Sequence, residues 1–266
     1  MPELAWVTVT VLANEVDGHP ARADELRFPA LVNYGHFTAL QVRKRAVRGL
    51  DRHLERLDAA TRELYDTGLP PSRVLGHIRH ALGDHADATV RVSVFQADPG
   101  LEPSVMVTVR PAAAAPQVPQ RLQSVTFRRA LPHIKHAGTF GQIHYGRVAE
   151  RNGFDDALFT EDGSVVSESA TANLAGYGGG AVSWPDAPHL HGITMQLLEH
   201  ALPAAGVTTR RKRITLDDLR SFDAVFLTNS LGIAAVGQVD ERRLHISPSV
   251  LEALTGVYES IPWDPI

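Results

Sequence analysis

The sequence has 266 residues, 44% of them hydrophobic, and a formal net charge of −4. This length suits one large domain or two smaller ones, and the slight acidity argues against nucleic-acid binding, which usually needs a clustered basic surface. Because the chain contains no cysteine, disulfides, thiol chemistry and thiolate metal sites are excluded. No apolar run is long enough to span a bilayer and the first residues lack a secretory pattern, so we expect no membrane association and a cytoplasmic location.

Hydrophobic periodicity predicts four strands and two helices in the first part of the chain. Alternating apolar residues predict the strands, over 5–12, 37–42, 89–95 and 104–109. Leucines at helical spacing predict an amphipathic helix over 49–66. Ser72 is expected to cap a second helix that ends near Leu82.

The stretch from Pro111 to Pro119 is rich in proline and alanine and is the clearest linker. We predict a small N-terminal α/β domain over 1–112, a linker over 113–122 and a larger domain over 123–266. The larger domain should contain strands, over 124–128, 156–160, 165–166, 174–180, 181–184, 208–214 and 224–228. It should also contain helices, over 141–152, 194–201, 216–222 and 247–259. The pattern indicates a two-domain α+β protein.

Lysine is rare in this chain: only Lys44, Lys135 and Lys212 are lysines among 26 basic residues. Lys44 and Lys212 stand within runs of arginine, which are normally solvated. Lys135 instead lies in Leu131-Pro132-His133-Ile134-Lys135-His136-Ala137-Gly138, among apolar, small and imidazole side chains. A half-buried lysine can lose its proton and act as a nucleophile, which arginine cannot do. On this feature alone, a lysine that extends along the surface toward solvent is the more common explanation.

The 13 histidines raise the question of a metal site. His77 and His80 have a spacing that can place two rings on one helical face, and His189 and His191 could do so on a strand. Neither pair has a third clustered ligand, so we predict no metal site.

Four further stretches occur with the lysine segment in a recognisable order: His53-Leu54-Glu55-Arg56-Leu57, Val166 to Asn173, Leu190-His191-Gly192-Ile193-Thr194, and Phe226-Leu227-Thr228-Asn229-Ser230. Together they resemble the class IV pyridoxal-phosphate enzymes, which are the branched-chain aminotransferases, D-amino-acid aminotransferases and aminodeoxychorismate lyases. The resemblance runs from about Tyr34 to Asp240. No single motif is specific, but five in this order are jointly strong.

The resemblance implies a two-domain fold-type IV enzyme, whose larger domain has a barrel-like sheet, with pyridoxal 5′-phosphate as cofactor. Lys135 would be the catalytic residue, forming a Schiff base with the cofactor's aldehyde. Glu168 would pair with the pyridine nitrogen and keep it protonated, which makes the ring an electron sink. The ordinary alternative for Glu168 is an exposed carboxylate at the end of a strand.

The resemblance also implies a phosphate-binding set. It comprises Arg56, Ser230 and the helix start at Gly192, Ile193 and Thr194, where backbone N–H groups favour an anion. Asn173 completes the predicted cofactor-binding residues. For Arg56 the ordinary alternative is a surface guanidinium on the first helix.

The segment from Tyr34 to Val42 resembles the part of the family that lines the substrate, so Tyr34, Phe37 and Thr38 are the predicted substrate residues. Thr38 and Gln41 stand where glutamate and arginine are common. The tyrosine that often follows the lysine is missing, and Tyr145 occurs a helical turn later. The departures at Thr38 and Gln41 concern the substrate, which the sequence does not identify, whereas the missing tyrosine is the one that often bonds the cofactor's ring oxygen.

The leading functional hypothesis is transamination between an amino acid and a 2-oxo acid, both small molecules. The alternative is pyruvate elimination of the aminodeoxychorismate lyase type, which Lys135-His136 and Asn229-Ser230-Leu231 favour. A second alternative is a non-catalytic relative that acts as a binding protein. The resemblance further implies a homodimer.

Overall fold

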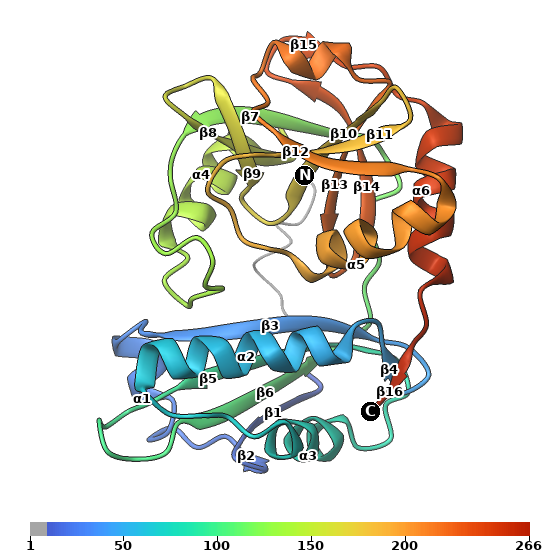
Figure 1. Cartoon of the computed structure of the whole chain (residues 1–266). Helices are drawn as coiled ribbons and strands as arrows, with labels where there is room; N and C mark the ends of the chain where they lie inside the picture. The colour runs from blue at the N-terminus through green and yellow to red at the C-terminus, as the bar shows by residue number, and fades with distance from the viewer. Residues whose placement is uncertain (1–9) are drawn as a thin grey trace. The chain divides into compact units, whose positions relative to one another are not determined.

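The computed structural model describes residues 10–266, which form two compact units (Figure 1). The first unit contains the described residues up to Ala113, Ile134–Gly138 and Trp263–Ile266. The second contains Ala114–His133 and Thr139–Pro262. The predicted α+β class with a barrel-like larger unit is confirmed by the sheets described below. No helix within the described residues is long and apolar enough to cross a membrane.

Two short segments that we assigned to the larger domain pack instead with the first unit. The segment Ile134–Gly138 pairs with the start of β3 (Gly35–Val42), because Phe37 N–H donates to the carbonyl of Lys135 at 2.8 Å. At the other segment, β16 (Asp264–Pro265) pairs with β4 (Ala46–Val47). Asp264 Oδ2 also accepts a hydrogen bond from Leu50 N–H at 3.0 Å, at the N-terminus of a helix, where a carboxylate is favourable.

The sheet of the first unit is antiparallel, with the strand order β2-β1-β6-β5-β3. Its other strands are β1 (Ala13–Val16), β2 (His19–Pro20), β5 (Ala88–Phe95) and β6 (Ser104–Arg110). The predicted strands over 37–42, 89–95 and 104–109 are therefore confirmed. Of the strand predicted over 5–12, residues 5–9 lie outside the described part. Residues 10–12 are not in a strand, and their apolar side chains at Val11 and Leu12 are exposed.

Two long helices cover one face of this sheet. They are α2 (Leu50–Tyr65) and α3 (Pro71–Leu82), and both confirm predicted helices. A shorter helix, α1 (Arg27–Leu31), was not predicted. Alternate strand residues such as Val92 and Val107 are fully buried against Leu57 of α2 and Ile78 of α3 in one core. Because strand side chains alternate between faces, this core fixes which residues of β3 point toward α2.

The second unit is built on a ring of six strands. They are β7 (Gln120–Thr126), β8 (Asp156–Glu161), β9 (Val165–Ser169), β10 (Asn173–Gly178), β13 (Ala224–Asn229) and β14 (Gly232–Val239). The order is β10-β13-β14-β7-β8-β9, and β9 pairs back onto β10 to close the ring. Beyond β10 the sheet continues through β11 (Ala181–Pro185) and β12 (Thr208–Lys212), while β15 (Arg242–Arg243) pairs with β14.

Side chains of β13 show how this unit is packed. Val225 and Leu227 belong to one buried cluster, whereas Phe226 between them belongs to another with α5 (Ile193–Ala201) and α6 (Pro248–Ser260). A third cluster joins α4 (Phe140–Arg151) to β8. Short 3₁₀ turns, η1 (Leu202–Ala205) and η2 (Asp218–Ser221), follow α5 and precede β13. The ring is therefore apolar on both faces, and its helices lie outside it (Figure 1).

Three details of the second unit differ from the sequence-based expectation. β7 begins at Gln120, inside the predicted linker, because it pairs in parallel with both β14 and β8. β14 was not predicted, since its run of glycine and alanine lacks the usual β-branched alternation. The helix expected over 216–222 is reduced to η2. By contrast, the turn at Asp162-Gly163 has two positive φ angles, +50° and +72°, as a tight hairpin requires.

Candidate active site

Glu168 lies in β9 and is only 5% exposed. Its Oε1 accepts a hydrogen bond from Arg129 Nη1 at 3.4 Å, and its Oε2 accepts one from Leu190 N–H at 3.2 Å. Arg129 is also buried, with 8% of its side chain exposed. A buried carboxylate is costly unless it is paired and hydrogen-bonded, and these two contacts offset that cost. Glu168 is thus not an exposed strand-end carboxylate.

Asn173 in β10 is the residue paired with Glu168 where the ring closes. Its Nδ2 donates to the carbonyl of Leu190 at 2.7 Å. Since Glu168 accepts from the N–H of Leu190, Glu168 and Asn173 together bind both backbone polar groups of Leu190. Gly192 follows two residues later with an ordinary φ of −64°. A Cβ added there would lie 2.0 Å from Asn173 Oδ1. Glycine at 192 is therefore required by close approach and not by backbone conformation.

The start of α5 lies next to the end of β13. Thr194 is buried, and its Oγ1 donates to the carbonyl of Asn229 at 2.6 Å. Ser230 directly follows Asn229 and is half-buried. Ile193 is the first residue of the helix, so this region combines backbone N–H groups of a helix start with a strand-end hydroxyl. Since the single hydroxyl proton of Thr194 is already used, the donor that this residue offers an anion is its backbone N–H.

Lys135 lies beside β3 in the first unit. Its Nζ is 4.9 Å from the ring centroid of Phe37, and the guanidinium carbon of Arg91 is 3.5 Å from the same centroid. Phe37 is 8% exposed, so most of its surface is used in packing. The lysine is half-buried, whereas Lys44 is exposed. Lys135 is thus a half-buried amine that lies against an aromatic ring, as Lys212 also does beside Phe222.

Arg56 on α2 reaches β3 through Thr38. Its Nη2 donates to Thr38 Oγ1, and the same oxygen is 2.7 Å from His53 Nδ1. Thr38 is completely buried between the strand and α2. The structure therefore gives Thr38 a different position from the expected substrate contact. Its hydroxyl is committed to Arg56 and His53.

Buried imidazoles dominate the electrostatics of this face of the first unit. Burial, followed by the positive charges of Arg56 and Lys135, lowers the pKa of His53 well below its ordinary value. Burial and Arg56 lower the pKa of His36 to about 4. His36 Nε2 is 3.0 Å from Thr61 Oγ1, which itself donates to the carbonyl of Leu57. Both rings are consequently neutral at physiological pH.

Tyr34, the third predicted substrate residue, is 51% exposed. Its ring makes an edge contact with Tyr65, at 5.9 Å between centroids. It helps to line a hollow of about 420 Å³ within the first unit, together with residues of α1 and of the segment 96–100. Tyr145, considered as a substitute for the missing tyrosine, packs its ring against Phe127 and Phe159.

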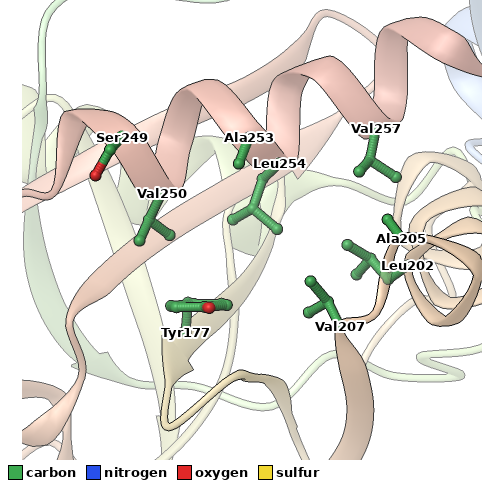
Figure 2. A pocket seen from close by; sticks show the side chains of 9 residues that line it. All are labelled: Tyr177, Leu202, Ala205, Val207, Ser249, Val250, Ala253, Leu254 and Val257. Carbon is green, nitrogen blue, oxygen red and sulfur yellow. The ribbon is translucent and has the colours of Figure 1, made fainter.

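A second hollow, of about 250 Å³, lies in the second unit against α6 (Figure 2). Val250, Leu254 and Val257 of this helix point toward Tyr177 and Val207 across it. Its lining is almost entirely apolar and includes none of the predicted site residues. The space is also smaller than the pockets that usually hold small-molecule ligands. It is therefore a gap at the edge of the helix packing and not a candidate active site.

Three site features were missed by the sequence reasoning. Arg129 was not singled out, because Arg128-Arg129 after a strand reads as a solvated basic pair. The bonds from His53 and Arg56 to Thr38 were missed, although the spacing of three residues between the first two does place them on one helical face. Among the described residues, no group of three or more His, Asp or Glu side chains is placed to hold a metal ion.

Comparisons with known proteins agree with this geometry. The family model described as amino-transferase class IV matches residues 35–239. Among solved structures, a putative 4-amino-4-deoxychorismate lyase from Legionella pneumophila is 22% identical with a TM-score of 0.79, covering 88% of this chain and 93% of that one. No curated protein matches.

Two further solved structures share the fold. A branched-chain aminotransferase from Thermoproteus uzoniensis, solved with norvaline, is 20% identical with a TM-score of 0.80, covering 94% of each chain. A hypothetical aminotransferase from Mycobacterium tuberculosis, in its PLP-bound form, is 21% identical with a TM-score of 0.76, covering 88% of this chain and 90% of that one.

Proposed function

We propose that the chain, which belongs to the amino-transferase class IV family, uses pyridoxal 5′-phosphate to transfer an amino group between an amino acid and a 2-oxo acid. The observation that carries the proposal is that Lys135 and Arg56 both contact adjacent residues of β3. The Lys135 carbonyl accepts a hydrogen bond from Phe37 N–H at 2.8 Å, and Arg56 Nη2 donates to Thr38 Oγ1. The predicted amine and the predicted phosphate-binding guanidinium thus lie in one region of the first unit.

The residues present fit this cofactor. Gly192 leaves no room for a side chain beside Asn173, and it opens a helix whose first N–H groups suit a phosphate. Glu168 is a buried carboxylate that is held by two donors. Lys135 is a half-buried amine against an aromatic ring. An amine, a fixed anion and an anion-binding helix start are the three groups that an aldehyde-bearing pyridine phosphate needs.

When bound, pyridoxal phosphate supplies an aldehyde and an electron-withdrawing ring that stabilises negative charge at the Cα of an amino acid. In our proposal Lys135 Nζ would hold the cofactor covalently, and once the substrate's amino group displaces it, the freed amine would take the proton from the substrate's Cα. Glu168 would hold a proton on the pyridine nitrogen. Arg56, Ser230 and the backbone N–H groups of Ile193 and Thr194 would bind the phosphate. The Arg129 guanidinium pairs with Glu168 and fixes the position of its carboxylate.

A second candidate is elimination of pyruvate, which the same lysine would serve. The sequences Lys135-His136 and Asn229-Ser230-Leu231 favour it, as set out above. The two reactions differ in their products, because transamination needs a 2-oxo acid acceptor and elimination does not.

The test is a half-reaction screen with purified protein saturated with pyridoxal phosphate. A productive amino acid should convert the visible band of the bound cofactor to the ultraviolet band of the pyridoxamine form and release the matching 2-oxo acid. Release of pyruvate from 4-amino-4-deoxychorismate without any acceptor would favour the lyase. Failure to develop a visible band after addition of the cofactor would instead indicate a non-catalytic relative.

A further inference from the structure

The hydroxyl of Thr38 is shared by two side chains of α2. It lies 2.7 Å from His53 Nδ1 and accepts a hydrogen bond from Arg56 Nη2. His53 and Arg56 are three residues apart, so they lie on the same face of the helix, over β3. The hydroxyl and the imidazole are buried, at 0% and 5% exposure. The contact between Arg56 and Thr38 is therefore shielded from solvent by the sheet.

The guanidinium fixes the direction of its own bond to Thr38, and the tautomer of His53 decides the direction of the other. A guanidinium only donates, so Thr38 Oγ1 must accept from Arg56, and its own single proton remains available. His53 is neutral, because burial and two nearby cations lower its pKa. Its Nδ1 can then accept the Thr38 proton, with its ring proton on Nε2. With the ring proton on Nε2, the chain of donors runs from Arg56 to Thr38 to His53.

We propose that Thr38 and His53 are positioning residues that hold the Arg56 guanidinium in the orientation in which it binds a phosphate ester. The inference rests on the proposed function, in which Arg56 binds the phosphate of the cofactor. An arginine side chain loses considerable rotamer freedom when it binds, and fixing it beforehand removes that cost from the binding step. A guanidinium that binds through several N–H groups also depends on orientation more than a point charge does.

The acceptor on Thr38 is chemically well suited to this task. Its hydroxyl is polarised by donating to an imidazole, which strengthens it as an acceptor for Arg56. The Thr38–His53 pair orients Arg56 while adding no negative charge. This explains why a neutral imidazole is buried next to a cation.

The experiment compares Thr38→Val, which removes the hydroxyl at constant shape, with Thr38→Ser, which retains it. For each protein the affinities for pyridoxal 5′-phosphate and for pyridoxal are measured by absorbance titration. Both compounds can form the same bond to a lysine, so the ratio of their affinities reports the phosphate alone. We expect Thr38→Val to lower this ratio about tenfold, as loss of a hydrogen bond to a charged group implies, and Thr38→Ser to retain most of it. Thr89→Val, a buried threonine whose hydroxyl bonds to Gln41, is the matched control and should leave the ratio unchanged.

A parallel pair tests the imidazole. His53→Asn keeps an acceptor at the place of Nδ1, whereas His53→Leu removes it, so only the second should lower the ratio. Because the ratio is taken within each variant, a general loss of folding lowers both affinities and is not mistaken for the effect. An unchanged ratio in Thr38→Val and His53→Leu would overturn the inference.

Arg56→Met separates this inference from the proposed function. If this variant loses the preference for the phosphorylated compound while Thr38→Val keeps it, Arg56 binds phosphate without help from Thr38, and only the inference fails. If Arg56→Met keeps the preference, the phosphate role of Arg56 is itself wrong, and the inference falls with it.

Discussion

Glu168 and Asn173 are the paired residues at which β9 meets β10 and the six-stranded ring closes. Each also bonds to the backbone of Leu190, one through its N–H and the other through its carbonyl. The closure of the ring, through backbone pairing, and the placement of the segment that leads into α5, through side-chain bonds, therefore involve the same two residues. This relationship links the predicted nitrogen-pairing carboxylate to the predicted phosphate-binding helix start.

Replacing Glu168 by Gln should slow the half-reaction by ~10²-fold or more while leaving cofactor binding mostly intact. A neutral amide cannot hold a proton on the pyridine nitrogen, and preorganised charges of this kind are worth that order of rate. Stopped-flow absorbance with a saturating amino acid measures the effect. Glu161→Gln, at the end of the neighbouring β8, is the control. A rate equal to that of the unaltered protein would assign Glu168 a purely structural role.

Gly192→Ala should weaken cofactor binding and lower the melting temperature. The new Cβ would lie 2.0 Å from Asn173 Oδ1, so either the amide or the helix start must move. The same substitution in an Asn173→Ala background should cost less than in the unaltered protein, because the collision is gone. Gly256→Ala in α6, where a Cβ meets nothing within 4 Å, should be neutral or slightly stabilising. Equal costs of Gly192→Ala in both backgrounds would show that the contact is unimportant.

Much of the fold and of the site followed from local sequence patterns. Lys135 and Glu168 were predicted as site residues from ordered motifs, α2 from its leucine spacing and α3 from the cap at Ser72. The contacts of Thr38 were not predictable, since alternation along β3 does not say which face α2 covers. Arg129 was missed for a similar reason: its burial depends on Glu168, which is distant in sequence. The pairing of Ile134–Gly138 with β3 is likewise a long-range hydrogen-bonding event that local propensity does not encode.

Acid should destabilise the protein in a window set by its buried histidines. The unfolded chain binds a proton at His36 near pH 6.5, whereas the folded chain does so only near pH 4. Stability is therefore fully present above pH 6.5 and falls as the pH drops toward 4, by about 3 kcal/mol for His36 alone. His53 acts in the same direction.

Urea unfolding between pH 7 and pH 4 measures this loss of stability. His36→Gln should flatten the profile, and His85→Gln, at an exposed position, should not. A stability that does not change over this range would contradict the burial of neutral imidazoles.

We also predict a homodimer, as the family resemblance implies and as is most common for soluble enzymes. Sedimentation of the cofactor-loaded protein at micromolar concentration should give about twice the chain mass of 28.9 kDa. Full activity in a species of the single-chain mass would rule out a dimeric enzyme.

The central claim is that Lys135 carries the cofactor, and reductive trapping tests it most directly. Borohydride treatment of the protein with bound pyridoxal phosphate fixes the cofactor on the lysine that holds it, and peptide mapping by mass spectrometry identifies the site. With only three lysines in the chain, the result is unambiguous. We expect the pyridoxyl group on Lys135, and no pyridoxyl group at position 135 in the Lys135→Arg variant. Stoichiometric labelling of Lys44 or Lys212, with Lys135 unmodified, would contradict the account.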